Sequence, residues 1–278
     1  MGCELLRRML PIMAVLLCHQ AAPGSAQIAK RSVSLQGIDS GDCVAQPCRT
    51  IQYAINQTPQ GSFANINVAP GVYDEALLVC EFRRISLFGL GLAADDSCDP
   101  GAVVIRAPGG IVISTQDHAT GIYRCFTVTT AVAGGTGFHA RQHVIVDTFD
   151  VQIGRAGDPA LGYAIAGMTS ASVNCGGRMF MKTPVTVLLA AHDLSHGELG
   201  CAVDISQPGL VGYLITSANN GVVNTSQATF TGPGAATGVV YPYILSSLST
   251  LNTGGVVLPG TQPGQCYSGS VVNSGPPC

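Results

Sequence analysis

Two aspartates in the segment "DTFD" have a spacing that could support catalysis. Glycoside hydrolysis uses two carboxylates held at a fixed separation across the scissile bond. Asp147 and Asp150 are therefore candidate catalytic residues. A structural role competes with this hypothesis, because Arg124 stands 23 positions before Asp147 and an ion pair between them would account for both charges.

A second group of ionisable residues lies in the segment "HDLSHGE", in a chain where only 10% of the residues are charged. Imidazole and carboxylate groups are ligands for divalent metals and can also act as general acids and bases. We therefore take His192 as a candidate catalytic residue and Asp193, His196 and Glu198 as candidate metal ligands. The alternative is a solvated turn between two strands.

Aromatic faces are the usual platforms for sugar rings, and the chain has 8 tyrosines but no tryptophan. We take Tyr163 and Tyr213 as candidate substrate-binding residues, together with Arg141. The alternative is that the tyrosines belong to the core or its rim.

The first 26 residues have the pattern of a secretory signal peptide, with two arginines, an apolar run and small residues up to Ala26. The apolar run is shorter than the roughly 20 residues that a membrane-spanning helix needs. A lipoprotein anchor at Cys18 is the alternative. The pattern predicts export, to a secreted or periplasmic location, without a membrane span.

Cysteine usage agrees with an oxidising compartment. The chain has 11 cysteines, and removal of the leader with Cys3 and Cys18 leaves an odd number. Proximity in the sequence favours four disulfides, with Cys125 left as a buried thiol, although sequence alone does not prove connectivity. The favoured pairs are Cys43 with Cys48, Cys80 with Cys98, Cys175 with Cys201, and Cys266 with Cys278.

Composition narrows the class of protein. The net charge of −3 offers no basic stripe for a phosphate backbone, so we do not expect nucleic acid as a partner. Low charge combined with 35 glycines and many β-branched residues is typical of short strands separated by turns.

The order of elements predicts a solenoid. The segment "RTIQYAINQ" places Ile51, Ala54 and Ile55 at helical spacing, and strand patterns follow from residue 64 onward. The strands recur every 22 to 27 residues, which predicts a single-stranded parallel β-helix. The alignment of these repeats predicts two inward columns, one of Val128, Val151 and Val173 and the other of Ile113, Ala140 and Ile165.

Three segments resemble the N-terminal coils of the pectin-lyase-like superfamily: residues 47–56, 66–75 and 85–91. The resemblance implies an all-β right-handed parallel β-helix with a short N-terminal capping helix at Thr50 to Asn56. We therefore divide the chain into a predicted signal peptide (1–26), an N-terminal arm (27–48) and a β-helix domain that includes the C-terminal tail (49–278). Glu75 matches a structural motif of that superfamily, for which we expect a turn-stabilising role.

The catalytic motifs of pectinesterases, polygalacturonases and classical pectate lyases have no counterpart here. We therefore expect an exported β-helix that binds a polysaccharide or cell-surface glycan, without a cofactor. A polysaccharide lyase or glycoside hydrolase is the first alternative, and a lyase of this kind often uses Ca²⁺. A structural surface or phage-tail-like protein is the second, and the choice between monomer and homotrimer stays open.

Overall fold

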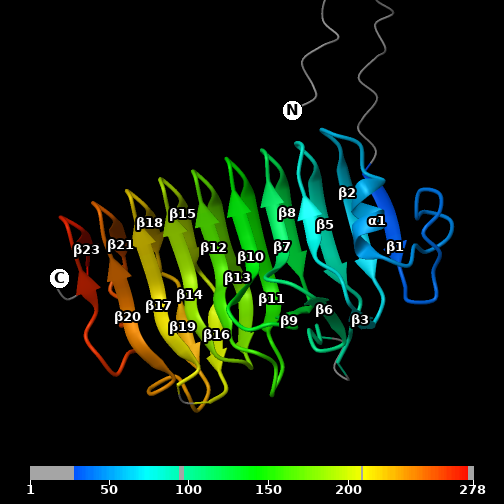
Figure 1. Ribbon diagram of the computed structural model, residues 1–278. Coiled ribbons are helices and arrows are strands. Elements are labelled where there is room, and N and C mark those ends of the chain that lie inside the picture. The colour runs from blue at the N-terminus through cyan, green and yellow to red at the C-terminus, as the bar shows by residue number, and fades with distance from the viewer. Residues whose placement is uncertain (1–27, 94–96, 208, 275–278) are drawn as a thin grey trace, which may run out of the picture.

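The computed structural model describes residues 28–93, 97–207 and 209–274. The predicted signal peptide and Cys278 lie outside these residues. The described chain winds into a parallel β-solenoid, in which strands pair in parallel with strands of the neighbouring coil (Figure 1). This confirms the predicted all-β parallel β-helix.

Each coil contributes strands to as many as three faces. The first face runs the whole length of the solenoid, and successive strands on it are hydrogen-bonded neighbours. Its strands are β1 (Ala29–Val33), β2 (Phe63–Val68), β5 (Arg84–Gly89), β8 (Thr120–Arg124), β11 (Ile145–Ile153), β13 (Ser172–Met181), β15 (His196–Leu199), β18 (Val222–Asn224), β21 (Thr250–Asn252) and β23 (Val271–Asn273).

The second face is shorter and shares two long strands with the first. β11 and β13 bend at a corner, so that their first halves pair on the first face and their last residues pair on the second. The strands confined to the second face are β3 (Gly71–Tyr73), β6 (Val103–Ala107), β9 (Thr127–Thr130), β16 (Ala202–Ile205) and β19 (Thr229–Thr231).

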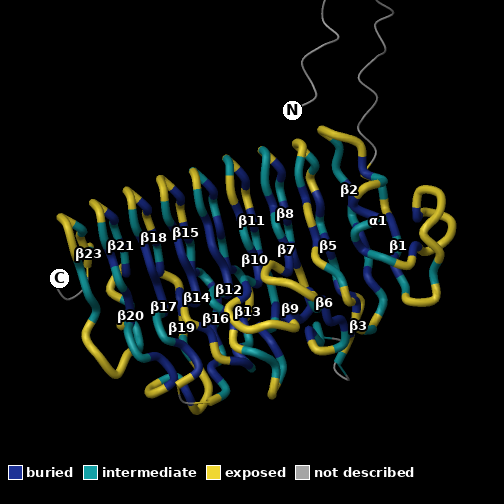
Figure 2. The backbone as a smooth tube through the Cα atoms, in the orientation of Figure 1, coloured by how far each residue is buried: buried dark blue, intermediate teal, exposed yellow. Residues whose placement is uncertain are grey.

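The third face is a separate eight-stranded sheet. In chain order its strands are β4 (Leu77–Val79), β7 (Ile111–Gln116), β10 (Gly135–Arg141), β12 (Leu161–Met168), β14 (Val185–His192), β17 (Val211–Ala218), β20 (Val239–Leu245) and β22 (Gln265–Cys266). Inward side chains of the three faces form one continuous apolar core, and exposed residues gather at the turns (Figure 2).

Two-residue turns connect the third face to the first. Both residues of each turn have positive φ, as in Asp117-His118 and Gln142-His143. The turns stack along the solenoid, so the His118 ring lies 5.2 Å from His143 and 5.0 Å from Phe82. Asp193 is the first residue of another such turn.

The predicted helix forms α1 (Ile51–Asn56), and its three predicted apolar positions are buried. Thr50 is its N-cap, and the Glu75 carboxylate accepts hydrogen bonds of 2.8 Å from the backbone N–H groups of Ile51 and Gln52. The Gln52 amide bonds both backbone groups of Leu78 in β4, at 2.7 and 3.1 Å. Because β4 is the terminal strand of the third face, α1 covers an open sheet edge.

The N-terminal arm differs from the prediction. It contains β1, which pairs with β2 over all five of its residues and so extends the first face. The sequence suggested only a polar arm because β1 is short and carries Lys30 and Arg31. Arg31 is nonetheless buried, where its guanidinium donates to the carbonyls of Asp42 and Gln57 at 2.6 Å.

The predicted registers are partly wrong. Val128 pairs with Ile153 rather than Val151, and Val173 pairs with Val146. All of these valines are buried, so they were correctly predicted to face inward, but the partner of Val128 is two residues and the partner of Val173 five residues away from Val151. The cause is the corner within β11, where the pairing shifts between Phe149 and Val151.

The second predicted column is wrong at one position. Phe138, and not Ala140, lies between Ile113 and Ile165. Phe138 and Ala140 are both buried, and they are two residues apart in the strand. Because inward positions recur every two residues, alternation alone does not distinguish between them.

Three disulfides join described cysteines. Cys43–Cys48 and Cys175–Cys201 confirm two predicted pairs. The predicted Cys80–Cys98 pair is wrong, because Cys98 bonds Cys125 in the next coil and Cys80 is a free thiol. Parallel stacking brings residues one coil apart together more effectively than short chain separation does. Cys278, the predicted partner of Cys266, lies outside the described residues.

Candidate functional site

One column of outward side chains runs the length of the first face, and all of its members except Ile122 are polar. Each member pairs in register with the next, about 4.8 Å apart per coil. From the N-terminal end the column reads Lys30, Asn65, Ser86, Ile122, Asp147, Asn174, Glu198, Asn224, Asn252 and Asn273.

The column brings together two predicted site residues. Asp147 and Glu198 lie two coils apart, with Asn174 between them. The Asn174 amide donates a 2.7 Å hydrogen bond to the Asp147 carboxylate. Two coils correspond to about 10 Å between backbones, slightly more than the roughly 6.5–9.5 Å that separates the two carboxyl groups of inverting glycosidases.

Asp150 does not join this pair. It lies at the corner of β11 with a positive φ, and its carboxylate accepts a 3.2 Å hydrogen bond from the backbone N–H of Arg178. The guanidinium groups of Arg124 and Arg178 lie 3.9 and 3.8 Å from the same carboxylate. The sequence suggested an ion pair between Arg124 and Asp147. In the structure Arg124 pairs instead with Asp150, at the corner of β11.

The segment "HDLSHGE" is divided between two faces. His192 ends β14 on the third face, where its Nε2 lies 3.1 Å from the Thr216 hydroxyl. Asp193 is in the turn and accepts a 2.7 Å hydrogen bond from Asn219. His196 and Glu198 project from β15 on the first face.

This division separates the residues that the sequence predicts as metal ligands. Asp193, His196 and Glu198 do not form one ligand set, and the described part of the chain contains no group of three or more His, Cys, Asp or Glu that could hold a metal.

The predicted substrate-binding residues lie on the third face. Tyr163, Val187, Tyr213 and Tyr241 form one outward column there. The rings of Tyr213 and Tyr241 stack at 5.0 Å with an interplanar angle of 15°. Tyr163 and Tyr213 pack against Val187, which is only 5% exposed. Arg141 ends β10 at the edge of the same face.

Two histidines of the third face are shifted in pKa. Burial lowers the pKa of the His139 imidazole, and the neighbouring Arg141 charge lowers it further. Burial also lowers the pKa of His192, against an opposing effect of the Asp193 carboxylate. His139 Nδ1 is buried without a hydrogen-bond partner in the described structure. Both rings are therefore held toward the neutral form.

A groove of about 310 Å³ opens on the first face near its N-terminal end. Five outward side chains from β1, β2 and β5 line it: Lys30, Asn65, Asn67, Ser86 and Phe88. The Arg124 guanidinium lies 5.6 Å from the centroid of the Phe88 ring, at one side of the groove. An ammonium, two amides, a hydroxyl and an aromatic ring thus face a single hollow.

The groove's polar groups have unused hydrogen-bonding capacity. Among the described residues, the side chains of Asn65, Asn67 and Ser86 have no hydrogen-bond partner. Asn224 and Asn252, further along the same column, differ because their Oδ1 atoms accept from backbone N–H groups two residues on. The groove asparagines are free to bind a ligand, whereas the later ones hold turns.

These groove residues were not predicted from the sequence, although the sequence contains a usable signal. In "ANINV" the buried positions Ala64, Ile66 and Val68 alternate with Asn65 and Asn67. The same alternation in "RISLFG" exposes Ser86 and Phe88 on the neighbouring strand. Searching for ionisable residues passed over amides and hydroxyls, which are the groups that bind uncharged ligands.

Comparison with known proteins yields no assignment. No protein-family model matches the chain, and no curated protein matches it. In the described residues, no helix is long and apolar enough to cross a membrane.

Proposed function

We propose that this protein is an exported β-helix that binds a polysaccharide in the first-face groove, without catalysing its cleavage. The observation that carries the proposal is the set of unpartnered amides and hydroxyl beside Phe88. Sugars offer hydroxyl groups that both donate and accept hydrogen bonds, and their apolar C–H faces pack on aromatic rings. Asn65, Asn67 and Ser86 supply the polar partners, and Phe88 supplies the ring.

The solenoid also suits an extended ligand. The outward column continues from the groove past the Asp147–Asn174 pair, so a glycan lying along the axis would cross one strand about every 4.8 Å. The Phe149 ring lies over the backbone of Gly176, where an added Cβ would be 2.5 Å from Cε1. This gives a second aromatic surface beside the column. The three disulfides agree with the proposed export.

The test is a glycan array followed by calorimetry on the best ligand. We expect binding by the wild-type protein and a loss of affinity of about tenfold or more in the Asn65→Ala/Asn67→Ala variant, because two hydrogen-bonded amides are removed. Asn252→Ala is the matched control, since Asn252 lies in the same column outside the groove. Equal loss in both variants, or no glycan bound at all, would refute the groove as the site.

A second candidate function rests on Asp147 and Glu198. Their separation of two coils on one open face would admit a water molecule and a glycosidic bond between them. Reducing-end release and unsaturated-product assays on pectin, alginate and capsular polysaccharides, with and without Ca²⁺, test for hydrolase and lyase activity. Turnover that is abolished by Asp147→Asn would replace the binding proposal with an enzymatic one.

A further inference from the structure

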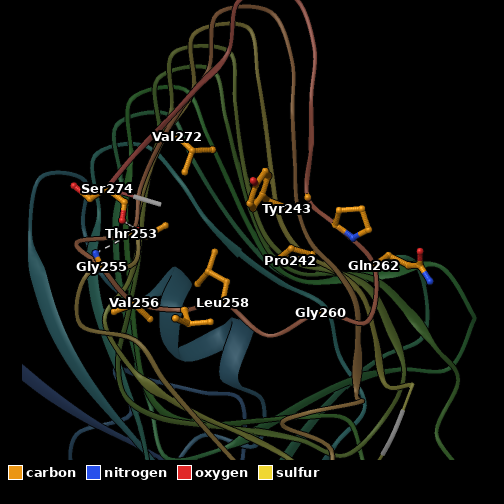
Figure 3. A pocket seen from close by; sticks show the side chains of 13 residues that line it. Pro242, Tyr243, Thr253, Gly255, Val256, Leu258, Gly260, Gln262, Val272 and Ser274 are labelled. Atoms are coloured by element: carbon orange, nitrogen blue, oxygen red, sulfur yellow. Dashed lines mark hydrogen bonds between the residues drawn. The ribbon is translucent and has the colours of Figure 1, made fainter. Parts of the chain in front are cut away.

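Two hollows of the solenoid differ in the charge around them. A cavity of about 530 Å³ at the C-terminal end is lined mainly by apolar groups, among them Tyr243, Val256 and Leu258 (Figure 3). No charged side chain contributes to its described lining. The first-face groove, toward the N-terminal end, has the side chain of Lys30 in its wall. Of these two hollows, the groove is therefore the one that offers a site for a charged ligand.

Two further cations border the groove. Arg84 begins β5, and its guanidinium lies 5.8 Å from the centroid of the Phe63 ring. Arg124 ends β8 and pairs in register with Phe88 of the groove. Because Lys30 lies on β1, the three cations stand on β1, β5 and β8, which follow one another with β2 at the N-terminal end of the first face (Figure 1).

The positive charge at this end of the first face is largely uncompensated. Lys30 and Arg84 are exposed, and their side chains form no ion pair or hydrogen bond within the described structure. Arg124 shares the Asp150 carboxylate with Arg178, at 3.9 and 3.8 Å. Neither Asp nor Glu occurs in β1, β2, β5 or β8. The groove therefore lies in a local field that attracts anions.

The sign of the charge reverses further along the same face. Asp147 and Glu198 stand in the outward column that begins with Lys30. The cationic stretch from β1 to β8 covers three coil spacings, or about 14 Å between backbones. Acidic groups of a ligand are attracted over this stretch and repelled from β11 onward, so the face distinguishes where a ligand can carry charge.

We propose that the glycan bound in the groove is a polyanion, which rests on the proposed function and adds the class of ligand to it. Its carboxylate or sulfate groups pair with Lys30, Arg84 and Arg124. A guanidinium donates two parallel hydrogen bonds to the oxygens of such a group, whereas the lysine ammonium acts as a point charge. The amides of Asn65 and Asn67 then bind hydroxyl groups of the same sugars.

Calorimetry with two matched pairs of polymers tests the class of ligand: dextran sulfate against dextran, and polygalacturonate against its methyl ester. We expect the wild-type protein to bind at least one polyanion about tenfold or more tightly than its uncharged counterpart. Raising NaCl from about 0.05 to 0.5 M should weaken this binding severalfold, because exposed charges are screened by salt. Binding of either polyanion supports the proposal, and their relative affinities identify the acidic group.

Lys30→Gln/Arg84→Gln removes the two cations that have no ion-pair partner in the described structure. Affinity for the polyanion should fall about fivefold to tenfold, since each exposed ion pair contributes modestly. Arg106→Gln/Lys182→Gln is the matched control, because it removes the same charge elsewhere: Arg106 lies on β6 of the second face, and Lys182 follows β13. Affinity in the control should stay within about twofold.

Equal affinity for charged and uncharged polymers, or equal loss in these two variants, would overturn the proposal. A neutral glycan that binds as tightly as the polyanions, and whose binding is weakened by Asn65→Ala/Asn67→Ala, would refute the anionic ligand while leaving the proposed function intact. No binding of any glycan, charged or uncharged, would instead refute the proposed function itself.

Discussion

The outward surfaces of the first and third faces follow the same rule of parallel register, yet their side chains are engaged very differently. On the third face, Tyr213 stacks on Tyr241, and the flanking tyrosines leave Val187 only 5% exposed. In the first-face groove, the amides of Asn65 and Asn67 have no partner within the described structure. Outward position alone therefore does not identify a binding surface, and it is the unused hydrogen-bonding capacity of the groove that supports the proposed one.

The largest effect that separates the two faces should come from Tyr213→Ala. This change removes the stack with Tyr241 and uncovers Val187. We expect a loss of about 2 kcal/mol in the free energy of unfolding, below the roughly 3–5 kcal/mol of a fully buried aromatic because Tyr213 is partly exposed. Denaturant unfolding measures it, and glycan affinity should stay within about twofold. A large loss of affinity with unchanged stability would move the binding site to the third face.

Phe88→Ala should show the opposite pattern. Phe88 lines the groove and is only partly buried, so its loss should alter stability by less than about 1 kcal/mol. Glycan affinity should fall about tenfold, which corresponds to about 1.4 kcal/mol, because the aromatic surface under the sugar is removed. Calorimetry on both variants gives a direct comparison. If Phe88→Ala and Tyr213→Ala change affinity equally, the two faces do not differ in function.

The same comparison shows which features the sequence could predict. Helical spacing found α1, because Ile51, Ala54 and Ile55 all face the core. The alternation of apolar and polar residues correctly predicted the buried strand positions, because it depends only on the two-residue period of a strand. The pairing register between neighbouring strands was harder to predict. The corner at Asp150 inserts a residue with positive φ, and local sequence patterns do not reveal it.

The candidate site was predicted in part. Asp147 and Glu198 were singled out as ionisable residues in a chain of low charge, and the structure places them in one column. Their assigned companions, Asp150 and Asp193, have other partners, and these contacts depend on which coils are neighbours. The groove was missed because its amides and hydroxyl are not ionisable, and because Lys30 lies beside Asn65 only when β1 pairs with β2.

A change at Gly176 tests whether the Phe149 ring, the second aromatic surface on the first face, contributes to glycan binding. An added Cβ would lie 2.5 Å from Cε1 of Phe149, so Gly176→Ala must displace that ring. We expect a loss of stability of about 1 kcal/mol and a fall in glycan affinity of about threefold if the ligand extends beyond the groove. Gly109→Ala is the control, because a Cβ added at Gly109 would have nothing within 4 Å. Unchanged affinity would confine the ligand to the groove.

The smallest effect concerns pH and belongs to the third face. Burial lowers the folded-state pKa values of His139 and His192 below the ordinary value of 6.5. As pH falls below about 6.5, the unfolded chain therefore binds protons that the folded chain does not, and stability decreases. Above that pH both states are neutral at these sites, so their effect disappears. The Arg141 charge reinforces the shift at His139, and Asp193 weakens it at His192.

Thermal unfolding between about pH 7.5 and 5.5 tests this sign. We expect the midpoint of the wild-type protein to fall toward acid pH, and the His139→Gln/His192→Gln variant to show a shallower fall, because two groups that must remain neutral have been removed. His118→Gln/His143→Gln changes two exposed turn residues and controls for substitution of histidine in general. An equal or steeper fall in the first variant would contradict the assignment. Glycan affinity should be the same in both variants, since neither pair contributes to the lining of the groove.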